Sequence, residues 1–178
     1  IWGIDLGMTG GGGDLIHNVE FSPDGNVVAF GHGLGERHIA YIWYFDEDTT
    51  VNRFEAPSDS ENRHLSVEVT SLKFNASGDL LATGSCDKTV RIWEVSTQEL
   101  RLTLDGHNGC VRVVEFSPDG NLLVSGSPDE MILWDVLSGE RLAVLETNGT
   151  VWDGGFSPDG ALLVAALYDG NLKIWGIP

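Results

Sequence analysis

Few side chains in this sequence are spaced in a way that would support catalysis or metal binding. The histidines, which are the most versatile candidates, are His17, His32, His38, His64 and His107. Their spacing is not that of a metal site, and no Cys-x-x-Cys pair supports zinc. A Gly-x-Ser-x-Gly segment, which is typical of a hydrolase nucleophile, is also missing. The sequence therefore predicts no catalytic residue, no metal site and no cofactor.

Two further segments have both a chemical and a structural interpretation. Residues 7–13 are rich in glycine like a phosphate-binding loop, but no lysine and hydroxyl pair follows them, which favours a loose connection. The segment Ser85-Cys86-Asp87 could hold a nucleophile, yet no general base accompanies it. We expect Asp87 to be a turn residue and Cys86 to be a surface thiol.

An acidic segment likewise lacks the pattern of a binding site. Its members are Asp46, Glu47, Asp48, Glu55, Asp59 and Glu61. Calcium loops need alternating oxygen ligands, and this run of carboxylates does not supply them. We expect a solvated loop, although loops on rigid scaffolds often carry recognition.

The charge of the chain restricts its partners. The formal net charge is -17, from 10 basic and 27 acidic residues. Such a surface repels nucleic acid and anionic membranes, so we expect neither as a direct partner. A basic protein partner is compatible with this charge, although solubility alone explains it equally well. No apolar stretch approaches the roughly 20 residues of a membrane helix, and we expect an intracellular location in the cytoplasm or nucleus.

The elements that position these side chains repeat along the chain. The tetrapeptide Ser-Pro-Asp-Gly begins at Ser22, Ser117 and Ser157, each time after a phenylalanine and before an apolar run. A degraded copy occupies residues 75–78. Tryptophans recur at spacings of 41, 50, 41 and 41 residues, at Trp2, Trp43, Trp93, Trp134 and Trp175. A period of roughly 40–45 residues is typical of propeller blades with four strands, so the sequence predicts an all-β fold.

The third copy shows how one unit is expected to fold. Val111, Val114 and Phe116 are the apolar anchors of a first strand. Residues 117–120 form a turn, because proline presets φ and glycine tolerates a left-handed conformation. The second, third and fourth strands are predicted at residues 121–126, 131–134 and 140–145.

These repeats resemble those of the WD40 family, and the resemblance covers essentially the whole chain. In the third copy the motif consists of Gly106-His107, residues 116–120, Ser125-Gly126-Ser127, Asp129 and Trp134-Asp135. The resemblance implies a β-propeller with about four four-stranded antiparallel blades, which form part of a larger ring.

The resemblance also implies a buried, hydrogen-bonded tetrad in each blade, with a structural rather than a catalytic role. The third copy alone has all four members, which are His107, Ser125, Asp129 and Trp134. The spacing from Asp129 to Trp134 is one residue shorter than that from Asp87 to Trp93. The first copy retains only its tryptophan, Trp43.

The repeats predict how the chain is divided. Residues 1–13 are the end of a preceding blade and a glycine-rich link, and residues 14–66 are a blade with the acidic insertion. Further blades follow at residues 67–105, 106–146 and 147–178, the last without its outer strand. Three arrangements remain open: a segment of a longer propeller, which we favour, half of a ring completed by a second copy, and a small divergent ring.

The function that the resemblance implies is a non-catalytic scaffold, which binds proteins or peptides on the top face of the propeller. We use this name for the face that carries the turns between second and third strands and the connections between blades. On it we predict a partner-binding cluster of Arg112, Trp152 and Tyr168, because aromatic residues and arginine are enriched at interface hot spots. In the alternative interpretation, Trp152 packs against a neighbouring blade.

Two other functions remain open for the whole protein. The propeller could be the regulatory or sensor part of a larger enzyme or switch protein, such as a kinase or a nucleotide hydrolase. It could also be a purely architectural oligomer.

The two cysteines, Cys86 and Cys110, are too few for a disulfide framework. We expect free thiols in a reducing compartment. Both residues should nevertheless lie on the same face of neighbouring blades, where a bridge is conceivable.

Overall fold

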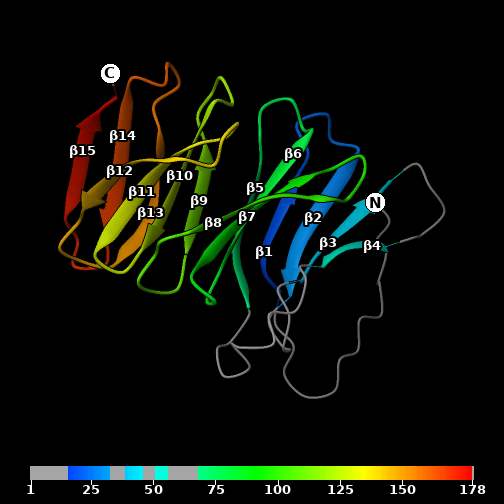
Figure 1. Cartoon of the computed structure of the whole chain (residues 1–178), viewed down its shortest axis with the longest axis horizontal. Coiled ribbons are helices and arrows are strands. Elements are labelled where there is room, and N and C mark those ends of the chain that lie inside the picture. The colour runs from blue at the N-terminus through cyan, green and yellow to red at the C-terminus, as the bar shows by residue number, and fades with distance from the viewer. Residues whose placement is uncertain (1–15, 33–38, 46–50, 56–67, 178) are drawn as a thin grey trace, which may run out of the picture.

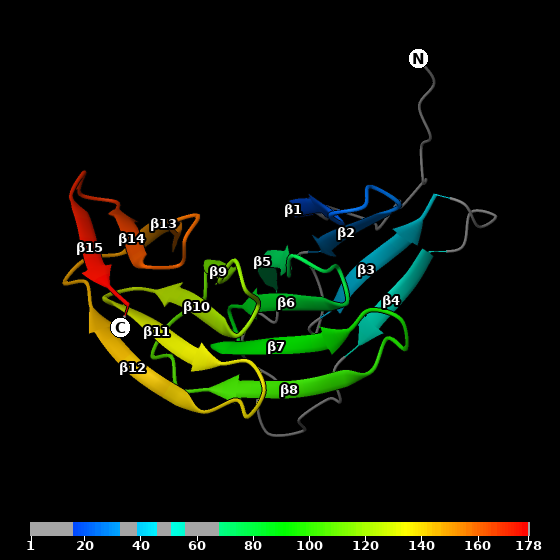
Figure 2. The same cartoon turned by 90° about the horizontal axis from the view of Figure 1, so that it is seen from above.

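The computed structural model describes residues 16–32, 39–45, 51–55 and 68–177, and every regular element in these ranges is a β-strand. The strands form four antiparallel sheets, which stand side by side as blades (Figure 1). Seen from above, the blades follow an arc, with the first strand of each blade on the concave side (Figure 2). The all-β fold and the blade architecture predicted from the repeats are therefore confirmed.

Three sheets have four strands in sequence order and the fourth has three. The first blade consists of β1 (Ile16–Phe21), β2 (Val27–His32), β3 (Ile39–Tyr44) and β4 (Val51–Glu55). The second consists of β5 (Val69–Phe74), β6 (Leu80–Ser85), β7 (Thr89–Glu94) and β8 (Leu100–Asp105). The third consists of β9 (Val113–Phe116), β10 (Leu122–Ser127), β11 (Glu130–Asp135) and β12 (Arg141–Glu146). The fourth consists of β13 (Val151–Phe156), β14 (Leu162–Leu167) and β15 (Leu172–Gly176).

The Ser-Pro-Asp-Gly turn joins the first two strands of a blade by side-chain hydrogen bonds. In the third blade, the Ser117 hydroxyl donates to Asp119 Oδ1 at 2.6 Å and accepts the N–H of Leu122 at 2.9 Å. Gly120 follows with a φ of 75°, in the left-handed region that glycine adopts without a steric penalty. The bond from Ser117, followed by those from Asn121, lowers the pKa of the Asp119 carboxyl.

The degraded copy of this turn keeps the same plan with different atoms. Asn75 Oδ1 accepts the N–H of Leu80 at 3.1 Å, in place of the serine hydroxyl. Its Nδ2 donates to Asp79 Oδ1 at 2.7 Å. An asparagine amide therefore reproduces both the donor and the acceptor that serine supplies elsewhere.

The apolar core lies between neighbouring blades rather than within one blade. Phe54 of the first blade and Trp93 of the second have ring centroids 5.4 Å apart. The core between the second and third blades contains Leu80, Ala82, Val90, Ile92, Leu104, Val111, Val114, Phe116, Leu123, Ile132, Trp134 and Val136. Each blade therefore buries both faces only when it has a neighbour on each side.

The outer faces of the first and fourth blades show the consequence. Met131 and Leu133 of the third blade are buried against the fourth. Leu172 and Ile174 have the same positions in the fourth blade and are 62% and 63% exposed. Both end faces are apolar sheet surfaces, since Phe21 of the first blade is 59% exposed as well.

Some of the predictions fall outside the described residues. These are the blade end and glycine-rich link at residues 1–13, and most of the acidic insertion at residues 46–50 and 56–67. Of the five histidines considered as candidates, His38 and His64 also lie outside the described residues.

Candidate functional site

Three of the four predicted tetrad residues meet in the interior of the third blade. Trp134 Nε1–H donates to Ser125 Oγ at 2.7 Å, and His107 Nε2 lies 2.6 Å from the same oxygen. Ser125 is on β10, Trp134 is on β11, and His107 lies in the connection that enters the blade. All three side chains are buried. The cluster ties this connection to the two central strands, which is a structural role.

Asp129 does not join the cluster, so its assignment to the tetrad was wrong. Ser127 and Glu130 occupy the place that the motif gives to aspartate, with Ser127 Oγ 2.9 Å and Glu130 Oε1 3.4 Å from His107 Nδ1. Asp129 itself is exposed.

The short turn explains this outcome. Ser127 pairs directly with Glu130, which leaves Pro128 and Asp129 as a two-residue turn. Asp129 takes the left-handed position of that turn, with a φ of 71°. In the second blade, Lys88 holds the corresponding position, with a φ of 74°. Ser127 was detectable from the sequence, because residues two apart on a strand share a face and Ser125 was already assigned.

Burial gives His107 an unusual pKa. Desolvation lowers the pKa of this imidazole to about 4, and the Glu130 carboxylate opposes the shift. The ring is therefore neutral at pH 7 and cannot act as a cation there. One ring nitrogen donates and the other accepts, which suits a position between two serine hydroxyls.

Among the described residues, the first and second blades surround their tryptophans differently. In the second blade, Trp93 Nε1–H donates to Thr83 Oγ1 at 2.9 Å. Asp87 Oδ2 forms an ion pair with Arg91 at 2.7 Å, within the same blade. In the first blade, Phe30 has the position of Thr83, and the buried indole N–H of Trp43 has no hydrogen-bond partner. It is the only such side-chain atom in the described part of the chain.

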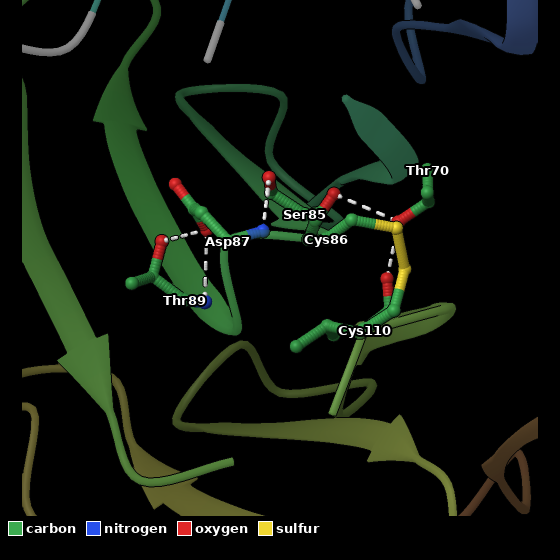
Figure 3. Close-up of a disulfide and its surroundings, with 8 residues drawn as sticks. Thr70, Ser85, Cys86, Asp87, Thr89 and Cys110 are labelled. Carbon is green, nitrogen blue, oxygen red and sulfur yellow. Dashed lines mark hydrogen bonds between the residues drawn. A yellow bond between two sulfur atoms is a disulfide. The ribbon is translucent and has the colours of Figure 1, made fainter. Parts of the chain in front are cut away.

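The cysteines do not remain free thiols, and that expectation was wrong. Cys86, in the turn between β6 and β7, forms a disulfide with Cys110, in the connection between β8 and β9 (Figure 3). Their predicted location on one face of neighbouring blades is what makes the bond possible. The bond joins the second blade to the third on the top face.

The three predicted partner-binding residues lie on the top face, and two of them are in contact. Trp152, at the start of β13, is 64% exposed, and Tyr168, in the turn between β14 and β15, is 75% exposed. Their ring centroids are 5.7 Å apart. Arg112 is exposed and lines, with Trp152 and Asp153, a cavity of about 270 Å³ on the concave side.

Charged residues on the inner strands form a further feature, which the sequence analysis missed. Lys73 Nζ on β5 lies 3.0 Å from Glu20 Oε1 on β1 and 3.6 Å from Glu115 Oε2 on β9. Burial raises the pKa of the Glu115 carboxyl, while Lys73 opposes that rise. The detectable signal was the residue before the anchoring phenylalanine, which alternates in charge over the first three copies, whereas the fourth copy has Gly155 there.

The described residues include no group of three or more histidine, cysteine, aspartate or glutamate side chains that could hold a metal ion. A helix able to cross a membrane is likewise not found in the described ranges.

Comparison with known proteins decides the family. A family model described as "WD domain, G-beta repeat" matches residues 58–94, 98–135 and 139–176, which together exceed half of the chain. The chain belongs to the WD40-repeat family. The second and third WD40 matches are offset from the blades: residues 98–135, for example, contain the outer strand β8 of one blade and strands β9 to β11 of the next. The matches begin at residue 58, so the first blade lies outside them.

Three curated WD40 relatives match this chain over part of their own length. The chain is 38% identical to small ribosomal subunit protein RACK1y of Oryza sativa subsp. japonica over 58% of this chain and 31% of that protein. It is 40% identical to eukaryotic translation initiation factor 3 subunit I of Xenopus tropicalis over 49% of this chain and 27% of that protein. It is 34% identical to guanine nucleotide-binding protein subunit beta of Oryza sativa subsp. indica over 61% of this chain and 32% of that protein. The matches thus span about a third of the length of these relatives.

Proposed function

We propose that this WD40 chain is a non-catalytic protein-interaction module, and that Arg112, Trp152 and Tyr168 belong to its docking surface. The exposed pair of Trp152 and Tyr168 carries the proposal. Exposed aromatic rings that contact each other offer a large, rigid apolar area at low entropic cost, and such residues dominate interface energetics. The names of the relatives support the same class of function, because each describes a component of a larger assembly.

A following blade is the main competing occupant of this surface. In the second blade, Thr70 and Cys86 have the positions of Trp152 and Tyr168, and both contact the third blade, at Val111 and Cys110. The third blade shows that a neighbouring blade need not cover this position. Arg112 has the same position as Trp152 and is exposed, although the fourth blade is in place beside it. A side chain at this position can therefore face solvent in a complete seam, as a docking residue must.

The proposed partner is a protein or peptide, and its contact region is basic. The net charge of -17 attracts a basic surface and steers its approach. The same charge disfavours direct binding of nucleic acid or of an anionic membrane. We infer an intracellular location, in the cytoplasm or nucleus.

Three alanine variants test the docking surface, namely Arg112→Ala, Trp152→Ala and Tyr168→Ala. A partner captured by the purified protein and identified by mass spectrometry is expected to bind each variant at least tenfold more weakly, equivalent to about 1.4 kcal/mol. The thermal transitions of the variants are expected to match that of the original chain. Leu137→Ala is the matched control, because Leu137 is 78% exposed on the opposite face and should not affect capture.

The two interpretations of Trp152 give different results. A lowered melting temperature of Trp152→Ala in the full-length protein assigns this ring to a seam between blades and contradicts the docking role. Unchanged binding of all three variants contradicts the docking surface as a whole.

The apolar end faces favour a second candidate, self-association that completes a ring. Leu172 and Ile174 on the fourth blade, and Phe21 on the first, would then be buried between copies. Sedimentation or light scattering of the chain tests this directly, and a monomer at micromolar concentration contradicts it.

A further inference from the structure

The disulfide lies at a seam that is already held by other bonds. Val111 N–H of the third blade donates to the carbonyl oxygen of Ser85 in the second blade at 3.0 Å. Thr70 Oγ1 of the second blade donates to the carbonyl oxygen of Val111. Ser85 and Val111 are the chain neighbours of Cys86 and Cys110. Thr70 and Ser85 lie beside the disulfide (Figure 3). We expect these hydrogen bonds to keep the two cysteines close together after the disulfide is reduced.

This arrangement makes the bond easy to close again after it is opened. Two thiols held side by side react as if at a very high concentration, because their ends need not search for each other. Both cysteines are only half-buried, so a small dithiol can reach them. Access is one of the conditions for thiol–disulfide exchange, and preorganisation favours closing the bond again.

The neighbouring seam shows that a blade does not need this cross-link. Between the third and fourth blades, Pro128 and Thr150 occupy the positions of Cys86 and Cys110, and these side chains cannot form a disulfide. The cores on the two sides of the third blade are nevertheless both continuous. The cross-link is therefore an addition to one seam.

The connection that contains Cys110 also carries His107 and Arg112. Residues 106–112 contain no strand, and they include His107, three residues before Cys110, and Arg112, two residues after it. His107 belongs to the buried cluster of the third blade. A covalent bond in the middle of such a connection restricts its motion more than it restricts the strands on either side.

We propose that Cys86 and Cys110 form a thiol–disulfide exchange site, which controls the mobility of the connection between the second and third blades. A thiolate of a dithiol attacks one cysteine sulfur, forms a mixed disulfide and releases the other cysteine as a thiolate, which takes up a proton. The second thiol of the reductant loses its proton and attacks the mixed disulfide. This attack releases the second cysteine as a thiolate, which takes up a proton. The products are two cysteine thiols and the cyclic disulfide of the reductant, so two electrons pass from the dithiol to the protein. This inference does not rest on the proposed docking function.

A redox titration of the original chain tests the site. The native protein is equilibrated with mixtures of reduced and oxidised dithiothreitol, alkylated under native conditions and weighed. We expect a reversible two-electron transition between molecules with no alkylated cysteine and molecules with two. Cys86→Ser is the control, because its single remaining cysteine should be alkylated without any reductant.

Amide hydrogen exchange tests the control of the connection. On reduction, exchange at Val111 is expected to accelerate roughly tenfold, because the loop-closing constraint is lost. Exchange in β10, which lies within the third blade, should stay unchanged. The double variant Cys86→Ser with Cys110→Ser should show the fast rate at Val111 in both redox states.

Three results would overturn the proposal. The bond could remain closed in excess reduced dithiothreitol, which would make it a static cross-link. Both cysteines could be alkylated after treatment with an excess of a stronger oxidant, oxidised glutathione, which would mean that the bond does not form. Equal exchange at Val111 in the oxidised and reduced protein would mean that the bond does not control the connection.

Discussion

The third and first blades have the same strand order, but their tryptophans differ in whether the indole N–H has a hydrogen-bond partner. In the third blade, the indole N–H of Trp134 donates to Ser125, which also contacts His107. In the first blade, Phe30 stands where Ser125 would be, and the N–H of Trp43 is buried without a partner. The blade with the polar cluster lies within the WD40 matches, and the blade without it lies outside them.

This difference shows that the polar cluster is not required for four strands to pair. The backbone ladder and the apolar faces form a blade in both cases. What the cluster adds is a link between the entering connection and the central strands, because His107 lies outside the sheet.

Truncating the third-blade tryptophan should produce the largest effect. Trp134 is 2% exposed and lies in the core shared with the second blade, so Trp134→Ala should lower the free energy of unfolding by about 3–5 kcal/mol. Phe116→Ala, in the same core, should cost a similar amount. Denaturant melts measure both losses of unfolding free energy. A loss for Trp134→Ala no larger than that of a variant at an exposed position would contradict the placement of Trp134 in the core.

Acid should weaken the third blade through His107. The pKa of this histidine is about 4 in the folded chain, whereas a histidine in the unfolded chain has a pKa near 6.5. Between these values the unfolded state binds a proton that the folded state does not, so stability falls as pH falls through this window. The loss attributable to His107 should reach up to about 3 kcal/mol below pH 4. Denaturant melts of the original chain and of His107→Gln from pH 7 to pH 4 isolate the contribution of His107. An equal change of unfolding free energy with pH in both proteins would contradict the lowered pKa of His107.

Removing the His107 ring at neutral pH should have a smaller effect. His107→Ala removes one hydrogen-bond partner from each of the buried hydroxyls of Ser125 and Ser127 and should cost about 1–3 kcal/mol. Glu140→Ala, at an exposed position in the same blade, should change stability by less than about 0.5 kcal/mol. Equal midpoints of the two variants in denaturant would show that the cluster does not stabilise the blade.

The smallest predicted effect is a difference between two phenylalanine variants. Trp134→Phe removes a hydrogen bond to Ser125, whereas Trp43→Phe removes an N–H that has no partner. The hydrogen-bond loss should make Trp134→Phe about 1 kcal/mol more costly than Trp43→Phe. A larger loss for Trp43→Phe would mean that its N–H does have a partner in solution.

The repeat made most of the fold predictable. The turn at residues 117–120 and the strands around it follow from local chemistry, so the observed strands β10, β11 and β12 lie within one residue of the expected bounds. The contact between Trp134, Ser125 and His107 follows from the family motif. The role of Asp129 was not predictable from residue type, because a turn that is one residue shorter moves an aspartate from the interior to the left-handed corner.

By itself, the sequence determined the period, the turns, the faces of each strand and the position of the exposed aromatic residues, because these depend on near neighbours in the chain. The tertiary structure alone decided which residues meet across a seam or complete a cluster. The bond between Cys86 and Cys110, the place of Glu130 beside His107, and the contacts of Lys73 with two glutamates are of this kind. These contacts join separate strands, turns and connections, and their geometry depends on the lengths of those connections and the packing of the blades, which no single repeat contains.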